Sequence, residues 1–168
     1  MSARVSATAT DVEIRLAQPD DVHAISAIYA WHVLNGRASF EETPPSIEEM
    51  RERMKKINGH GLPWLVALYR GVVVGYCYAS PYRPRPAYRY TVEESIYLDT
   101  TMTGLGIGSA LLNEVKQRYP MLSLEVYQKN GRAVNFYHAL GFRIEDGAWQ
   151  EQTKHPTWIM RWQADQTP

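Results

Sequence analysis

Apolar residues recur along this chain at two different spacings, one typical of strands and one typical of helices, and these spacings predict its elements. Val12, Ile14 and Leu16 alternate with charged residues, which is the pattern of a half-buried strand. After Pro19, apolar residues recur instead at helical spacing. The same rules predict strands at 12–16, 64–69, 72–79, 88–98, 122–127, 142–144 and 157–162. They predict helices at 19–33, 46–57, 106–118 and 130–140.

The predicted order of elements is β-α-α-β-β-β-α-β-α-β-β, which indicates an α/β fold. The strands at 64–69 and 72–79 are apolar on both faces, so helices should cover both sides of the sheet. We therefore expect a single domain at 12–163, with a mixed, twisted sheet of about seven strands and helices on both faces. Residues 1–11 and 164–168 are expected to form a disordered N-terminal tail and a C-terminal tail.

Composition narrows the classes of function. The 168 residues include 18 basic and 18 acidic side chains, so the net charge is zero and nucleic acid is not the expected partner. No stretch is apolar enough for a membrane span or a signal peptide, and the single cysteine, Cys77, fits a reducing compartment. The five histidines lack metal-ligand spacing. We expect a cytoplasmic protein with no membrane partner and no metal.

A glycine-rich turn carries the first candidate chemistry. An apolar strand ends at Leu98, a short polar turn follows, and Gly104, Gly106 and Gly108 open a helix. Backbone N–H groups and the positive end of a helix dipole meet at such a point, which favours phosphate. The spacing differs from the G-x-G-x-x-G dinucleotide fingerprint, and the lysine of a Walker loop is absent. A turn that only reverses the chain remains an alternative.

A second segment, 130–142, predicts an amphipathic helix with Asn130 as its cap. Its aromatic and apolar residues are also what a helix packed on a core would carry.

Together and in this order, the two segments resemble the GCN5-related N-acetyltransferase (GNAT) superfamily. The first is similar to its Q/R-x-x-G-x-G/A motif and the second to its N-x-x-A-x-x-F-Y-x-x-x-G-F motif. Within the superfamily, segments 35–45, 64–67 and 81–97 resemble the phosphinothricin and methionine sulfone N-acetyltransferases. The resemblance implies a single-domain GNAT fold, acetyl-CoA as co-substrate, a homodimer, and transfer to the α-amine of a small amino-acid-like acceptor of the phosphinothricin, methionine sulfone or sulfoximine type.

The resemblance also implies which residues hold the cofactor. They are the strand end, the turn, the helix start and two positions of the second segment: Ile96, Tyr97, Leu98, Thr101, Met102, Thr103, Gly104, Leu105, Gly106, Ile107, Gly108, Ser109, Asn130 and Tyr137. Thr101 stands where the family usually has Gln or Arg, so backbone N–H groups from about Met102 to Ser109 should hold the pyrophosphate. A backbone N–H near Leu98 is the implied oxyanion donor.

Acetyl transfer from a thioester to an amine requires that the amine lose a proton and that the leaving thiolate be stabilised. By resemblance, Glu93 is the general base, directly or through a water, and Tyr137 is the acid. Glu94 should point to the opposite face of a regular strand. A solvated carboxylate at Glu93 and a core aromatic at Tyr137 are the structural alternatives.

The acceptor site is expected to use Phe40, Arg83, Arg85, Tyr88 and Glu93. Two guanidinium groups suit an acceptor carboxylate or phosphinate, although they are also compatible with solvated loop arginines. Segment 149–156 departs from the family pattern. A polyamine, a peptide N-terminus or an antibiotic therefore remains an alternative acceptor, and a non-catalytic CoA-binding module is a further alternative.

Overall fold

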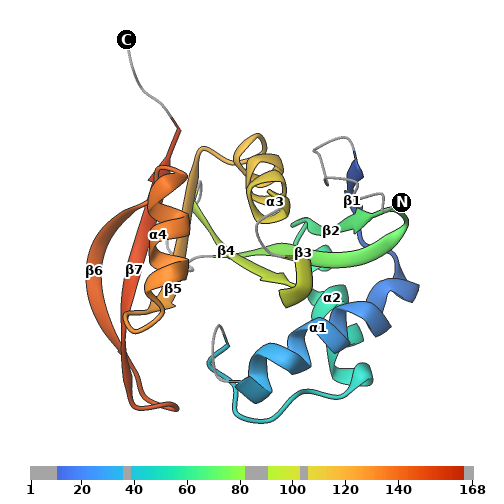
Figure 1. Cartoon of the computed structure of the whole chain (residues 1–168), viewed down its shortest axis with the longest axis horizontal. Coiled ribbons are helices and arrows are strands. Elements are labelled where there is room, and N and C mark those ends of the chain that lie inside the picture. The colour runs from blue at the N-terminus through green and yellow to red at the C-terminus, as the bar shows by residue number, and fades with distance from the viewer. Residues whose placement is uncertain (1–10, 36–38, 82–90, 103–105, 165–168) are drawn as a thin grey trace, which may run out of the picture.

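A seven-stranded mixed sheet is the framework of the molecule (Figure 1). The computed structural model describes residues 11–35, 39–81, 91–102 and 106–164. Within them the strands are β1 (Val12–Leu16), β2 (Trp64–Tyr69), β3 (Val72–Pro81), β4 (Thr91–Leu98), β5 (Met121–Tyr127), β6 (Arg143–Gln150) and β7 (His155–Gln163). Their order in the sheet is β1-β2-β3-β4-β5-β7-β6. Only β4 and β5 run parallel among these described pairs.

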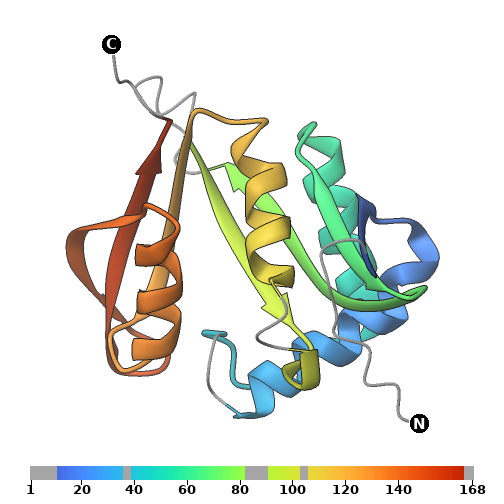
Figure 2. The ribbon, with the colours of Figure 1, turned by 45° about the horizontal axis from the view of Figure 1, so that its top comes forward.

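Four α-helices in the described residues cover the two sides of this sheet, as predicted. They are α1 (Val22–Asn35), α2 (Ile47–Gly59), α3 (Ile107–Lys116) and α4 (Gly131–Ala139). Figures 1 and 2 show α3 and α4 on the opposite side from α1 and α2. Two short 3₁₀ turns, Pro19–Asp21 and Thr100–Met102, precede α1 and follow β4. The first replaces the start that we predicted for the first α-helix.

Each side of the sheet has its own apolar core. On the α3 side, Ile107, Leu111 and Val115 pack against inward-facing residues of the central strands. On the α1 and α2 side, the core includes stacked aromatic rings, with Trp64 4.3 Å from Tyr78 between ring centroids. Strands that are buried on both faces explain the continuous apolar runs of β2 and β3. The prediction of a two-sided sheet is confirmed.

Local turn chemistry agrees with the sequence at the β2–β3 hairpin. Arg70 and Gly71 have φ values of 52° and 83°, and a two-residue hairpin turn with two positive φ angles is the type that matches strand twist. Gly141, just after the last α-helix, has a φ of 94°, a left-handed conformation that favours glycine at a helix end.

The prediction for β6 was too short, because we expected a strand only at 142–144 whereas β6 extends to Gln150. Most of β6 is exposed, and its pairing with β7 shifts register between Ile144 and Asp146. An exposed edge strand with a bulge does not need alternating apolar residues, so its sequence lacks the usual signal.

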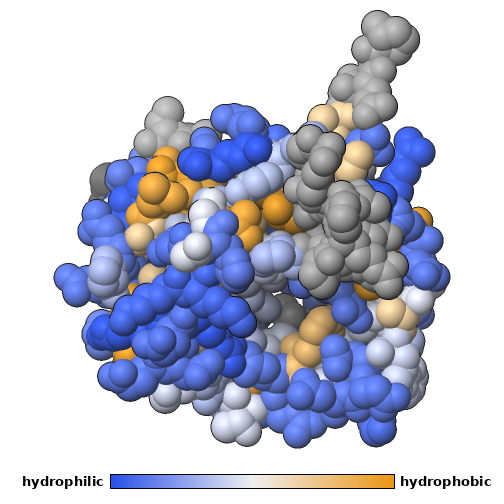
Figure 3. All heavy atoms as spheres, turned by 180° about the vertical axis from the view of Figure 1, so that it is seen from behind, coloured by the Kyte–Doolittle hydropathy of each residue, from blue (hydrophilic) through white to orange (hydrophobic). Residues whose placement is uncertain are grey.

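In the part of the chain that the structure describes, no helix is both long and apolar enough to cross a membrane. The face opposite that of Figure 1 is mostly hydrophilic, with small scattered hydrophobic areas (Figure 3).

Candidate active site

The site begins where β4 and β5 separate. Their parallel register consists of three pairs, Thr91–Met121, Val92–Leu122 and Glu93–Ser123. Beyond these pairs each strand remains paired with its other neighbour, β4 with β3 up to Leu98 and β5 with β7 up to Tyr127. The sheet therefore opens as a V between two strands that are each held from outside, and Figure 2 shows the divergence.

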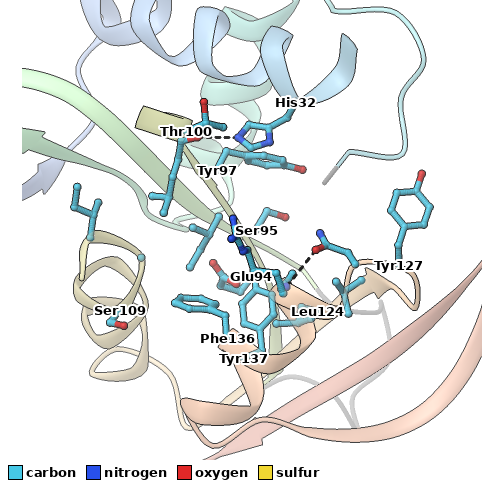
Figure 4. Close-up of a pocket in the computed structure, with 18 of the residues that line it drawn as sticks. His32, Glu94, Ser95, Tyr97, Thr100, Ser109, Leu124, Tyr127, Phe136 and Tyr137 are labelled. Carbon is cyan, nitrogen blue, oxygen red and sulfur yellow. Dashed lines mark hydrogen bonds between the residues drawn. The ribbon is translucent and has the colours of Figure 1, made fainter. Parts of the chain in front are cut away.

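A cavity of about 660 Å³ fills this opening, which is within the size range of small-molecule sites. Figure 4 shows His32 and Tyr97 on one side of it, Phe136 and Tyr137 on the other, and Glu94 and Ser95 between them. Its walls come from the separated strand ends, the start of α3, the start of α4 and the end of α1. Among the residues predicted to hold the cofactor, those that line it are Ile96, Tyr97, Leu98, Gly106, Ile107, Gly108, Ser109, Asn130 and Tyr137.

The start of α3 supplies the polar end of the cavity. Gly106 is the N-cap, with a φ of 77°, and the first hydrogen bond into the helix runs from the Ala110 N–H to the Gly106 carbonyl. The N–H groups of Ile107, Gly108 and Ser109 precede that bond, and helix geometry leaves such groups available at the positive end of the dipole. This arrangement suits an anion such as a phosphate.

Gly108 allows close packing between α3 and α4 beside the cavity. A Cβ atom at this position would lie 2.9 Å from Cζ of Phe136, which is closer than real side chains approach. The absence of a side chain therefore lets α3 lie against the Phe136 ring of α4, and both helices border the cavity.

The turn between β4 and α3 uses some of its own N–H groups. The Thr101 N–H and hydroxyl both donate to Oδ1 of Asp99, at 2.9 and 2.7 Å, and the Met102 N–H donates to the Asp99 carbonyl at 2.9 Å. Thr101 and Met102 are not cavity-lining residues. At the start of the stretch predicted to hold the pyrophosphate, from about Met102 to Ser109, the Met102 N–H is thus used by the 3₁₀ turn in this structure. Thr103, Gly104 and Leu105 lie outside the described residues.

The start of α4 borders the same cavity. Oδ1 of Asn130 accepts a hydrogen bond from the Ala133 N–H at 3.2 Å, so Asn130 caps the helix while lining the cavity. Arg132, one residue into α4, also lines it and brings a cationic side chain that neither of the two sequence motifs indicates.

Tyr137 lies deeper along α4, with its ring packed edge-on against Phe136 and Phe142 at centroid distances of 5.1 and 5.5 Å. Burial raises its pKa well above the ordinary value of 10.0, and the nearby Glu94 carboxyl and Cys77 thiol raise it further. Tyr137 therefore carries its proton at neutral pH, as an acid requires, and its packing also matches the structural alternative.

The two glutamates of β4 lie on opposite faces, as a regular strand predicts. Glu93 pairs with Ser80 of β3 and with Ser123 of β5. Burial is the main cause of the raised pKa of Tyr78 on the α2 side of the sheet, and the charge of Glu93 adds a smaller contribution. Glu94 is 2% exposed and is the one of the two that lines the cavity. Burial raises the pKa of Glu94 well above its ordinary value, with a further contribution from Glu93.

The connection from α1 to α2 meets the end of β5 at the mouth of the V. The Phe40 ring packs edge-on against Tyr127 at 4.9 Å, and the Tyr127 hydroxyl donates to the Ser39 carbonyl at 3.2 Å. Tyr127 also lines the cavity, so Phe40 lies directly behind one of its walls. Arg83, Arg85 and Tyr88, the other predicted acceptor residues, lie outside the described residues.

This connection is anchored by a partly buried polar network. Tyr29 hydrogen-bonds the Ser39 hydroxyl at 2.8 Å and donates to Glu41. Arg53 of α2 makes a two-point contact with the Glu41 carboxylate at 2.6 and 3.0 Å. The Arg53 hydrogen bonds hold the pKa of Glu41 below its ordinary value, so the pair stays ionised.

A family model fits this chain. The model of the acetyltransferase (GNAT) family matches residues 25–142, which is more than half of the chain. The chain belongs to this family. The match includes the separated strands, the start of α3 and α4, so it covers the cavity just described.

Individual relatives of this GNAT chain differ in their names. It is 52% identical over 99 residues to a phosphinothricin N-acetyltransferase of Alcaligenes faecalis, covering 59% of the chain and 50% of the relative. It is 61% identical over 62 residues to the peptidyl-lysine N-acetyltransferase YiaC of Escherichia coli, covering 37% and 42%. The alignment thus spans half or less of the length of both relatives.

The fold has matches among solved structures. A GNAT superfamily phosphinothricin acetyltransferase from Sinorhizobium meliloti, in complex with AcCoA, superimposes with a TM-score of 0.83 and 37% identity. The match covers 92% of this chain and 89% of that chain. The predicted GNAT fold is confirmed.

One further cavity residue comes from α1. His32 Nε2 lies 2.8 Å from the Leu98 carbonyl oxygen, and its ring packs against Tyr97 and Trp31. This contact fixes the strand end at which the resemblance places the oxyanion donor. No helical period selects His32, because the contact joins residues 66 positions apart. Within the described ranges, no group of three or more His, Cys, Asp or Glu residues is arranged to hold a metal ion.

Proposed function

We propose that this GNAT protein transfers the acetyl group of acetyl-CoA to the α-amine of a small amino-acid-like acceptor of the phosphinothricin, methionine sulfone or sulfoximine type. The observation that carries the proposal is the V-shaped opening between β4 and β5, which leads to the start of α3. We further propose that the enzyme acts in the cytoplasm as a homodimer.

The donor side of the cavity matches the parts of coenzyme A. The N–H groups at the start of α3 and the Arg132 guanidinium suit the phosphates. Where β4 and β5 separate, their backbone N–H and C=O groups no longer pair with each other and can bond the amides of a pantetheine arm. Phe136 and Leu124 form an apolar part of the cavity wall. The solved relative that binds AcCoA adds support from outside this chain.

For the chemistry, Glu93 is proposed as the general base. It lies on the face of β4 opposite Glu94, on the side of α2, so it approaches the reacting centre from the side away from α3 and α4. A carboxylate there can take the amine proton directly or through a water. Tyr137, which keeps its proton at neutral pH, is proposed to protonate the leaving thiolate. Phe40 and the arginines Arg83 and Arg85, with Tyr88, are proposed to bind the acceptor.

The test is thiol release from acetyl-CoA in the presence of methionine sulfone, methionine sulfoximine or phosphinothricin. Glu93→Gln should reduce kcat by about 10²-fold or more, which is the usual contribution of a positioned base, while CoA affinity stays near wild type. Glu13→Gln, which removes an exposed strand carboxylate from β1, is the matched control and should leave kcat unchanged. CoA binding without thiol release for any of the three acceptors would refute this acceptor class.

A second candidate is transfer to a lysine amine of a peptide, which is favoured by the relative named a peptidyl-lysine N-acetyltransferase. A lysine-containing peptide belongs in the same acceptor panel, beside a polyamine and an aminoglycoside. Turnover with the peptide alone would replace the first proposal by this one, and CoA binding with no turnover at all would indicate a non-catalytic module.

A further inference from the structure

Glu94 is a buried acid that the proposed chemistry does not use. Its side chain belongs to the α3 and α4 side of β4 and lines the cavity, yet the residue is only 2% exposed. Among the described residues, neither of its carboxyl oxygens has a hydrogen-bond partner. Buried polar groups are nearly always hydrogen-bonded, because leaving one unpaired is costly. A buried acid without a partner beside a cavity therefore suggests a function.

The surroundings of Glu94 are apolar with three titratable neighbours. Ala79 is its partner across the β3–β4 pair, and residues of the α3 core surround it. Besides burial, the charge of Glu93 on the same strand raises the pKa of Glu94. Glu94 in turn adds to the effect of burial in raising the pKa values of Cys77 on β3 and Tyr137 on α4. On the α3 side, two further charges affect the pKa of the Cys77 thiol beyond burial and Glu94: Arg118 lowers it and Glu114 raises it. No cation acts on Glu94 directly in this described set.

These surroundings favour the neutral form of the acid. Burial is the largest cause of the raised pKa of Glu94, and the charge of Glu93 adds to it. A neutral carboxylic acid differs from a carboxylate because it can donate a hydrogen bond. Tyr137 lies within electrostatic range and shares the cavity wall with it, as Figure 4 shows.

We propose that Glu94 is a positioning residue for acetyl transfer, a neutral carboxylic acid that donates a hydrogen bond to the Tyr137 oxygen as that phenol gives up its proton. The proposal rests on the proposed acetyl transfer. The two side chains are not hydrogen-bonded in the structure, and such contacts often tighten only when substrate is bound.

The amine nitrogen forms a bond to the acetyl carbon, and its proton goes to the general base and then to solvent. The carbon–sulfur bond breaks, its electron pair goes to sulfur, and sulfur takes the proton of Tyr137. The Glu94 O–H stabilises the resulting phenolate and keeps its own proton, and Tyr137 regains a proton from solvent. An ionised Glu94 would instead repel the phenolate, so the neutral form is the active one.

The first experiment compares Glu94→Gln with Glu94→Leu. Glutamine keeps a neutral donor and should stay within about threefold of the wild-type kcat at neutral pH. Leucine removes the donor and should lower kcat by about tenfold, equivalent to about 1.4 kcal/mol, while KM for acetyl-CoA changes less than about twofold. Wild-type kcat should decline as pH rises through the raised pKa of Glu94, and Glu94→Gln should lack this decline.

A double-mutant cycle tests whether Glu94 acts through Tyr137. In a Tyr137→Phe background, Glu94→Leu should cause no further loss of kcat. Ser26→Ala, which removes from α1 a buried hydroxyl that has no hydrogen-bond partner among the described residues, is the matched control and should lower kcat equally in both backgrounds or not at all. Equal kcat for wild type and Glu94→Leu, or losses by Glu94→Leu and Tyr137→Phe that simply add, would overturn the proposal.

A readout without turnover separates this proposal from the proposed function. The infrared difference spectrum between wild type and Glu94→Gln at neutral pH should contain the carbonyl band of a protonated carboxylic acid, and CoA should shift that band. A carboxylate band instead would overturn the inference even if the enzyme acetylates its acceptor. A protonated band that CoA shifts would support it even if the tested acceptors fail.

Discussion

Gly108 offers the most direct test of how the cavity is built. In Gly108→Ala the new Cβ would lie 2.9 Å from Cζ and 3.3 Å from Cε1 of Phe136, and 3.4 Å from Cδ1 of Leu98. Overpacking of this kind costs about 1–3 kcal/mol, while the better helix propensity of alanine returns about 1 kcal/mol. The net expectation is a loss of about 1 kcal/mol, which for a chain of this size lowers Tm by about 2–4 °C.

The assay is thermal unfolding of the variant together with a CoA titration. Because Phe136 lines the cavity, its displacement should also weaken CoA binding. Gly59→Ala is the matched control, since a Cβ at the end of α2 would meet nothing within 4 Å. This control should unfold at the wild-type temperature or slightly above it, with unchanged CoA affinity. A rise in Tm for Gly108→Ala equal to that of the control would refute the packing argument.

Three further predictions follow from single contacts. Arg132→Gln should weaken CoA binding by about two- to fivefold in low salt, because an exposed charge contributes modestly, and titrations at rising ionic strength should show the difference shrinking. Asn130→Ala should lower the free energy of unfolding by about 0.5–2 kcal/mol, as for other lost N-caps, which denaturant unfolding measures. The pKa of Glu41 is lower in the folded than in the unfolded protein, so its stabilisation is complete above its ordinary value of 4.5 and is lost as pH falls through the folded value. Arg53→Met should therefore lower Tm at pH 7 and flatten the acid decline of Tm, and an unchanged slope would contradict this.

Much of the fold was predictable because its signals are local. β2 and β3 are apolar on both faces, and a buried strand in a two-sided sheet must be so. Ser46 caps α2 by accepting a hydrogen bond from the Glu49 N–H at 3.1 Å, and Ser followed three residues later by Glu is a local sequence signature of a helix start. The opposite orientation of Glu93 and Glu94 also follows from strand parity alone.

The features that the sequence did not predict depend on contacts between residues that are distant in sequence. β6 is defined by its pairing with β7 rather than by apolar alternation. His32 reaches the site because α1 crosses the end of β4, and nothing near residue 32 indicates that contact. The alternation of side chains along a strand places the two glutamates on opposite faces. Only the positions of α3 and α4 show that Glu94 is the one that lines the cavity.

The two faces of β4 therefore offer a physical reason for two adjacent carboxyl groups with different tasks. A general base must be ionised, and Glu93 lies beside polar partners, Ser80 and Ser123, across its two neighbouring strands. A donor to Tyr137 must be protonated, and Glu94 lies in an apolar core that disfavours charge. The negative charge of Glu93 also disfavours ionisation of Glu94, so the base itself helps to keep the acid neutral. Glu93→Gln should therefore lower the pKa of Glu94 as well as abolish the base, and the alkaline decline of the residual kcat should move to lower pH. An alkaline decline that stays at the wild-type pH in Glu93→Gln would separate the two residues and refute this coupling.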